Sequence, residues 1–201
     1  LLLGLNLLGA PAMATEEPTF TASLKEGAFE VRSYPALVAA QVSVTGTRDE
    51  ASNAGFKLLA GYIFGGNTRK QSIAMTAPVV QAQASSEKIA MTAPVLQSSV
   101  PGQAGSWTVR CVMPSAYTLD TLPTPNDPSL QLIPVAPARF AVVTFSGLAY
   151  EDDVAQRTAE LNTYIKDHAL QPTAPPVLAR YNPPWTPWFM RRNEVLVAIA
   201  P

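Results

Sequence analysis

The chain has 201 residues and a mass of 21.4 kDa, with 47% hydrophobic residues, only 14% charged residues and a formal net charge of −1. This composition excludes a disordered charged chain, a coiled coil and a basic nucleic-acid binder. The length suits one globular domain, or two small halves packed closely together. Cys111 and His168 are the only residues of their types. An intramolecular disulfide and a metal site built from several cysteines or histidines are therefore excluded.

The first ten residues are almost entirely apolar. This run is too short to span a bilayer, which takes about 20 residues, but it suits the hydrophobic region of a secretion signal. Ala12 and Ala14 follow as an A-x-A cleavage pattern, so residues 1–14 are interpreted as a signal-peptide remnant. We expect export to the periplasm, with a thylakoid lumen as the alternative; a buried amino-terminal helix is the competing interpretation. Residues 15–27 read as a polar segment that precedes a domain at 28–201.

The start of this domain predicts two strands and a helix. Residues 29–34 read as a strand ended by a proline, and the period-two valines of 38–44 predict a second strand that pairs with the first as a hairpin. Thr47 and Glu50 have the spacing of a capping box, and apolar residues follow at helical intervals. Two consecutive glycines then predict a helix end after about four turns.

A run of seven residues, Ile-Ala-Met-Thr-Ala-Pro-Val, occurs at 73–79 and again at 89–95. In an extended chain its Ile, Met, Ala and Val side chains share one face, so each run reads as a strand with one apolar face. The polar stretch between the runs suits a hairpin, and we expect the two copies to pair antiparallel. Their prolines cannot donate to a ladder and are expected at strand ends, edges or bulges.

The next part of the chain predicts three more strands. In the strand at 107–113, Trp107, Val109, Cys111 and Met113 alternate with Thr108, Arg110 and Val112, which makes Cys111 a core residue. After a proline-rich loop, residues 130–135 and 139–145 read as strands. They are expected to pair as a second hairpin around Pro137.

The last part of the chain predicts a second helix and two further strands. Acidic residues at 151–153 favour a helix start, and apolar residues follow at steps of three and four up to His168. Residues 177–181 read as extended, and alternating apolar residues at 195–199 predict the final strand, with a loop rich in proline and tryptophan between them. The order of strand, strand, helix and strands thus occurs twice. It implies an α+β fold of antiparallel sheet with two helices and two pseudo-equivalent halves.

Several of these segments, taken together, resemble the SOUL haem-binding family. They are residues 55–63 (GFKLLAGYI), Gly66-Asn67, the repeated seven-residue run, Tyr181-Asn182 with Pro184, and Arg192-Asn193-Glu194-Val195. They occur in the family's order and spacing, from about residue 28 to 200. The resemblance implies a distorted antiparallel β-barrel with two helices, related to the effector-binding domains of bacterial regulators. It also implies that haem or a related tetrapyrrole binds in an apolar groove beside the first helix.

Aromatic side chains on a stiff loop suit a flat apolar ligand, and cationic side chains suit haem propionates. The candidate ligand-binding residues are Leu58, Leu59, Tyr62, Ile63, Arg69, Lys70, Trp185, Trp188, Arg191 and Arg192. Each has an ordinary structural role as the alternative. The helix residues would be buried in a core, the tryptophans would pack within the loop, and the cations would be solvated surface charges.

The iron ligand is a separate question, because this chain has Ser33 where some family members carry a histidine taken as an axial ligand. Serine is a poor haem ligand, so binding here would rest on another ligand or on none. His168 is the candidate axial ligand, against a structural role at a helix end. Met75, Met91 and Cys111 are better explained as core residues. No other metal site is expected.

The common catalytic motifs of hydrolases and dehydrogenases are absent from the sequence. We therefore expect a non-enzymatic, exported binder of haem or a related tetrapyrrole, for buffering, transport or scavenging. Nucleic acid is not an expected partner, and the mature form is expected to have no membrane span. Two alternatives stay open: a binder of other flat or amphipathic small molecules, and a pocket enzyme that acts on such a ligand, including the removal of iron from haem.

Overall fold

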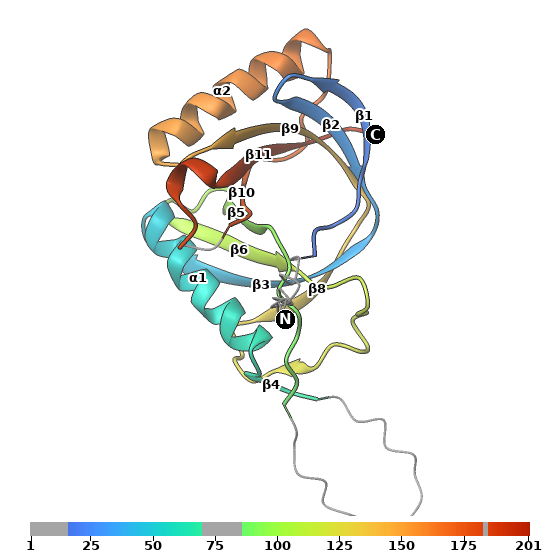
Figure 1. The fold of residues 1–201 in the computed structure, drawn as a ribbon, viewed down its shortest axis with the longest axis vertical. Helices are drawn as coiled ribbons and strands as arrows, with labels where there is room; N and C mark the ends of the chain where they lie inside the picture. The colour runs from blue at the N-terminus through green and yellow to red at the C-terminus, as the bar shows by residue number, and fades with distance from the viewer. Residues whose placement is uncertain (1–15, 70–85, 183–184) are drawn as a thin grey trace, which may run out of the picture.

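The computed structural model describes residues 16–69, 86–182 and 185–201 (Figure 1). In this part of the chain, two α-helices accompany a nine-stranded sheet and a small two-stranded one. The helices are α1 (Arg48–Ile63), α2 (Glu151–Asp167) and the short 3-10 helix η1 (Trp188–Met190). The strands are β1 (Thr21–Glu26), β2 (Phe29–Tyr34), β3 (Leu37–Thr45), β4 (Asn67–Thr68), β5 (Val95–Ser99), β6 (Ser106–Val112), β7 (Thr124–Pro125), β8 (Gln131–Val135), β9 (Ala138–Ser146), β10 (Val177–Arg180) and β11 (Arg192–Ile199).

The large sheet has the strand order β1-β2-β9-β11-β10-β5-β6-β3-β8, with antiparallel pairing throughout. Four strands of the first half correspond to four of the second: β2 to β8, β3 to β9, β5 to β10 and β6 to β11. When each strand is replaced by its counterpart, the strand order from β2 to β8 is reproduced in reverse. The two halves of the chain therefore occupy equivalent places in the sheet. The predicted α+β fold and its two pseudo-equivalent halves are confirmed.

The expectation of a barrel is wrong, because the sheet stays open. Its edge strands β1 and β8 each pair on one side only. Pro134 lies within β8, and a proline cannot donate to a further strand. The side chains of β1 are mostly exposed, so that edge has no apolar face to bury against a partner.

The hairpins predicted around Pro35 and around Pro137 are also wrong. β2 pairs with β1 and β9, whereas β3 pairs with β6 and β8. Tyr34 of β2 pairs with Ala138 of β9, and Leu37 of β3 pairs with Val135 of β8. The two ladders therefore share one register, and the residues between them place Pro35 opposite Pro137. Because proline has no N–H, the ladder is interrupted there. Each chain segment then passes from one half of the sheet into the other instead of turning back.

The helices cover the outer face of the bent sheet, α1 on one half and α2 on the other (Figure 1). The capping box of α1 is confirmed: the Thr47 hydroxyl accepts from the Glu50 N–H, and the Glu50 carboxylate accepts from the Thr47 N–H at 2.9 Å. Under α1 lies one core with Val42 and Val109, and under α2 lies another that includes Leu161. No helix among the described residues is apolar over a length sufficient to cross a bilayer.

The first copy of the repeated run, at 73–79, lies outside the described residues, so the pairing of the two copies stays a prediction. The second copy does not form the expected strand. Residues 89–94 are irregular, apart from a single bridge at Thr92, and β5 begins only at Val95. Pro94 cannot donate to a ladder, and the Thr92 hydroxyl instead donates to the Val112 carbonyl.

Two glycines of α1 allow a paired test of its packing. A Cβ added to Gly55 would lie 2.6 Å from Cβ of Val109, whereas one added to Gly61 would meet nothing within 4 Å. We expect Gly55→Ala to lower the free energy of unfolding by about 1–3 kcal/mol through overpacking. Gly61→Ala should raise it by about 0.5–1 kcal/mol, because alanine suits a helix interior better. Urea unfolding measures both changes, and equal effects would contradict this account of the α1–β6 contact.

His168 ends α2 and connects it to β1. Its ring Nδ1 lies 2.9 Å from the Tyr164 carbonyl oxygen and its Nε2 lies 3.2 Å from a Glu26 carboxylate oxygen, so the imidazolium donates to both. The Tyr164 carbonyl and then Glu26 raise the pKa of His168. A raised pKa in the folded state stabilises the fold fully below the ordinary value of about 6.5, and the effect is lost as pH rises through the raised value.

We therefore expect His168→Gln to lower the melting temperature at pH about 5 and to have little effect at pH about 9, where imidazole is neutral in both states. Thermal melts of both proteins across this range measure the difference. Glu26→Gln removes one of the two acceptors and should reduce the pH dependence in the same direction. A difference that grows with pH would rule out this role.

Candidate functional site

The α1 residues predicted to face a ligand lie in the core instead. Leu59, Tyr62 and Ile63 are 1–3% exposed and pack against the sheet, with Leu58 half-buried at the edge of the same cluster. The Tyr62 hydroxyl donates to the Pro123 carbonyl at 2.9 Å, and burial raises the pKa of Tyr62. These side chains already have their packing partners, so they hold α1 on the sheet rather than form an open wall.

The predicted cations have partners too, within the described residues. Arg69 forms an ion pair with Glu87 at 3.1 Å near the carboxyl end of α1, and Lys70 lies outside the described residues. Nε of Arg191 donates to the Thr186 carbonyl at 2.8 Å. Arg192 pairs with Glu17 and lies over the ring of Tyr181, 3.6 Å from its centroid.

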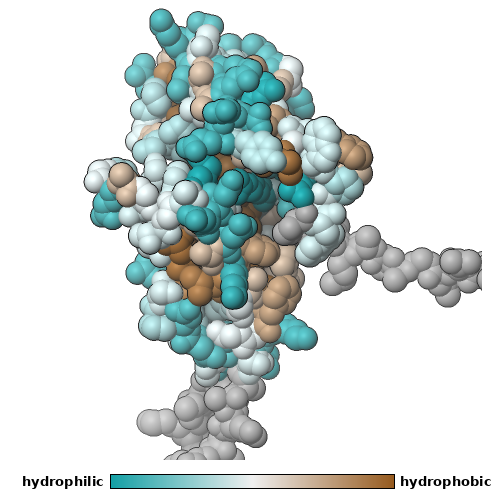
Figure 2. All heavy atoms as spheres, turned by 90° about the vertical axis from the view of Figure 1, so that its left-hand side faces the viewer, coloured by the Kyte–Doolittle hydropathy of each residue, from teal (hydrophilic) through white to brown (hydrophobic). Residues whose placement is uncertain are grey.

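The aromatic loop, defined as residues 182–191, is the most exposed apolar segment among these candidates. Trp185 is 82% exposed, and Trp188, Phe189 and Met190 are each 60–63% exposed. Trp188 and Phe189 lie edge to face, with ring centroids 5.7 Å apart. The face of the molecule that carries η1 is otherwise largely hydrophilic, with separate hydrophobic areas (Figure 2). So many large apolar side chains in water indicate a contact surface.

The structure does not bring the aromatic loop and the predicted α1 residues together. Arg180, just before the loop, bonds Asp49 at 2.9 Å and the Ser52 hydroxyl at 2.6 Å, both at the amino-terminal end of α1. Tyr62 lies about 15–20 Å further along that helix, at 1.5 Å per residue. The loop therefore leaves the sheet beside the start of α1, far from the side chains predicted to share its site.

A buried charge network at the stem of the aromatic loop was not predicted. Glu194, 2% exposed, accepts from Arg32 at 2.8 and 3.2 Å and from the Tyr181 hydroxyl at 2.6 Å. Thr144 adds a further hydrogen bond at 3.3 Å. Burial and the neighbouring Glu194 raise the pKa of Tyr181, which keeps its proton. The Arg-Asn-Glu motif at 192–194, which begins β11, thus supplies a buried charge to the interior.

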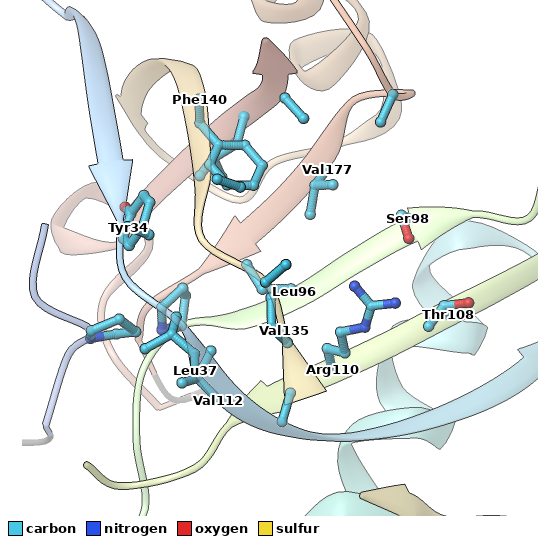
Figure 3. A pocket seen from close by; sticks show the side chains of 18 of the residues that line it. Tyr34, Leu37, Leu96, Ser98, Thr108, Arg110, Val112, Val135, Phe140 and Val177 are labelled. Atoms are coloured by element: carbon cyan, nitrogen blue, oxygen red, sulfur yellow. The ribbon is translucent and has the colours of Figure 1, made fainter. Parts of the chain in front are cut away.

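A cavity of about 410 Å³ on the inner face of the bent sheet was missed as well (Figure 3). Its wall is mainly apolar and includes Leu37, Leu96, Val112, Phe140 and Val177, together with the side chains of Tyr34 and Arg110. It falls within the range of about 300–1,000 Å³ found for ligand pockets. The predicted site residues do not line it.

The cavity forms because the alternation of faces shifts by one residue at the proline break. In β2 the even-numbered Tyr34 lines the cavity, and in β3 the odd-numbered Leu37 and Ala39 do. The partner strands shift in the same way, since both Val135 of β8 and Ala138 of β9 line it. One sequence signal could have pointed to the cavity. The alternation in β6 places Arg110 on the face opposite to Val109 and Cys111.

The remaining candidates have structural surroundings. Ser33 is half-buried in β2, and Met91 is half-buried outside any strand, while Met75 lies outside the described residues. The prediction that Cys111 is a core residue is confirmed by its 2% exposure, and burial raises the pKa of its thiol. Across 16–69, 86–182 and 185–201, no three His, Cys, Asp or Glu side chains gather as metal ligands.

Comparison with solved structures shows which proteins share the fold. The chain is similar to a hydrolase from Listeria innocua, with a TM-score of 0.56 at 10% identity, over 86% of this chain and 91% of that one. It is also similar to the EcmrR C-terminal domain, with a TM-score of 0.53 at 10% identity, over 90% of this chain and 98% of that one. At these identities the likeness concerns the fold alone.

Sequence comparison is more specific. Heme-binding protein 1 of Xenopus laevis is 30% identical over 173 residues, which cover 85% of this chain and 84% of that protein. Heme-binding protein 1 of Xenopus tropicalis matches with the same identity and coverage. The family model described as SOUL heme-binding protein matches residues 15–87 and 80–198. The chain therefore belongs to the SOUL haem-binding protein family.

Proposed function

We propose that this protein binds haem or a related tetrapyrrole on the aromatic loop, beside the start of α1, and serves to buffer, transport or scavenge it in an exported compartment. Family membership supports a tetrapyrrole as the ligand. The observation that carries the location is the exposure of Trp185, Trp188, Phe189 and Met190 within six residues. A flat ring that covers these side chains would remove their apolar surface from water.

The stem of the loop supports this role because it is held in place. The Asn182 side chain accepts from the Arg192 N–H at 2.6 Å, and Tyr181 and Glu194 are bonded to each other just below it. These anchors at the stem and the fixed φ of Pro187 limit the conformational freedom that residues 185–191 lose when a ligand binds. The aromatic side chains are thus offered to the ligand at low entropic cost.

A propionate partner is available at the same place. Arg192 pairs with Glu17, but both side chains are about 40% exposed, and exposed ion pairs contribute little to stability. A ligand carboxylate can therefore take the place of Glu17 on Arg192. Arg191, the neighbouring cation, has its Nε bonded within the loop and contributes positive charge to the same surface.

We infer that the tetrapyrrole ring is held without an axial iron ligand. His168 has both ring nitrogens engaged, Cys111 is buried, and Ser33 is a poor ligand for iron. Affinity then comes from stacking and propionate contacts, which ferric haem and iron-free protoporphyrin share. The two ligands should accordingly bind with similar affinity.

We expect both ligands to bind with comparable dissociation constants, and Trp185→Ala combined with Trp188→Ala to weaken both by at least about tenfold. The Soret band and tryptophan fluorescence of residues 15–201 measure binding, and two of the three tryptophans lie in the loop. Phe64→Ala is the matched control, since Phe64 is 59% exposed at the far end of α1. Equal losses in the control and the loop variant would rule out the loop as the site, and a strong preference for haem would show that iron is ligated.

A further inference from the structure

The cavity inside the bent sheet is separate from the aromatic loop. Residues 185–191 of the loop do not line it, although Tyr181 at the loop stem does. Its volume is about 410 Å³. Most of its wall is aliphatic or aromatic, so water inside it has few hydrogen-bonding partners. An apolar molecule would gain by replacing that water.

Arg110 is the exception in this apolar wall. It lies on β6 between β3 and β5, and its guanidinium group points into the cavity (Figure 3). Its Nε donates to the Gln41 side chain at 2.8 Å, and Gln41 in turn donates to the Gln131 side chain at 3.1 Å. The guanidinium is thus oriented by neutral amides.

No carboxylate among the described residues lies within 4.0 Å of the Arg110 guanidinium. By contrast, Arg32 of the buried charge network is paired with both Glu30 and Glu194. Burial without an acidic partner disfavours the charged form and lowers the pKa of Arg110. An anion inside the cavity would supply the missing charge.

The neighbours of Arg110 suit a carboxylate. Ser98 of β5 and Thr108 of β6 face each other across the ladder, and their hydroxyl groups lie on the same side of the cavity as the guanidinium (Figure 3). The opposite part of the wall carries Tyr34, Leu37 and Phe140. The cavity therefore has one end with several donors and one apolar end. Glu17, the carboxylate that lines it, is engaged by Arg192.

We propose that this cavity is a second binding site, for an amphipathic organic acid whose carboxylate bonds to Arg110 and whose apolar body fills the rest of the space. A guanidinium binds a carboxylate through two parallel hydrogen bonds, and Nη1 and Nη2 of Arg110 have no hydrogen bond to a described residue. The ligand class is a fatty acid or a compound of similar shape, with one acid group at the end of an apolar body. The argument for this site does not rest on tetrapyrrole binding at the loop, although Glu17 and Tyr181 line the cavity and also contact Arg192.

The test titrates dodecanoate and dodecanol, which share the apolar chain and differ in the acid group, into the protein by calorimetry. We expect dodecanoate to bind at least about tenfold more tightly, and Arg110→Gln to remove that preference while leaving dodecanol binding unchanged. Arg110→Lys should restore part of it. Arg157→Gln, which removes a half-buried charge on α2 that does not line the cavity, is the control and should behave as wild type.

Equal binding of acid and alcohol by the wild-type protein would overturn the proposal, and this comparison needs no variant. Unchanged dodecanoate binding in a folded Arg110→Gln protein would overturn it too. The variant with both loop tryptophans replaced should bind dodecanoate as wild type does, which separates this site from the loop. Stoichiometric displacement of dodecanoate by haem, lost in Arg110→Gln, would instead place the tetrapyrrole in the cavity and overturn the idea of a second site.

Discussion

The shape of this protein depends on two prolines that face each other across one antiparallel ladder. Pro35 and Pro137 remove the hydrogen-bond donors from both strands at the same level, so the ladder cannot continue flat through that point. The strands bend there, and the alternation of inner and outer side chains shifts by one residue. The outer face of each half then packs under its own helix, and the inner faces enclose a cavity. Both helix cores and the cavity thus follow from one interruption.

A buried network stiffens the end of the sheet where the aromatic loop begins. Arg32 on β2, Thr144 on β9 and Tyr181 beyond β10 all bond Glu194 on β11. A charge pair of this kind is costly to bury, and removal of one partner would leave the other uncompensated at about 3–5 kcal/mol. The network joins four chain segments at the stem of an otherwise exposed loop. It fixes where the loop starts, while the exposed side chains beyond it stay available for contact.

Local signals identified most elements, because local physics determines them. The capping box of Thr47 and Glu50 correctly predicted the start of α1, and period-two alternation identified β3, β6 and β11. The hairpins failed because the facing of Pro35 and Pro137 is a property of two distant segments. Leu59, Tyr62 and Ile63 were recognised as an apolar face, but periodicity does not say whether such a face meets a core or a ligand. Arg110 was visible on the polar side of an alternating strand, yet its importance depends on which strands enclose that side.

The pseudo-symmetric strand order also determines when the chain can fold. The ladders β2–β9, β3–β8 and β5–β10 each join the first half of the chain to the second. β11, synthesised last, lies between β9 and β10, so neither has both of its neighbours until residues 192–199 have been made. Such non-local pairing gives a high contact order and slow folding. A nascent or truncated chain that lacks β11 would therefore expose unpaired apolar strand edges, which favour self-association.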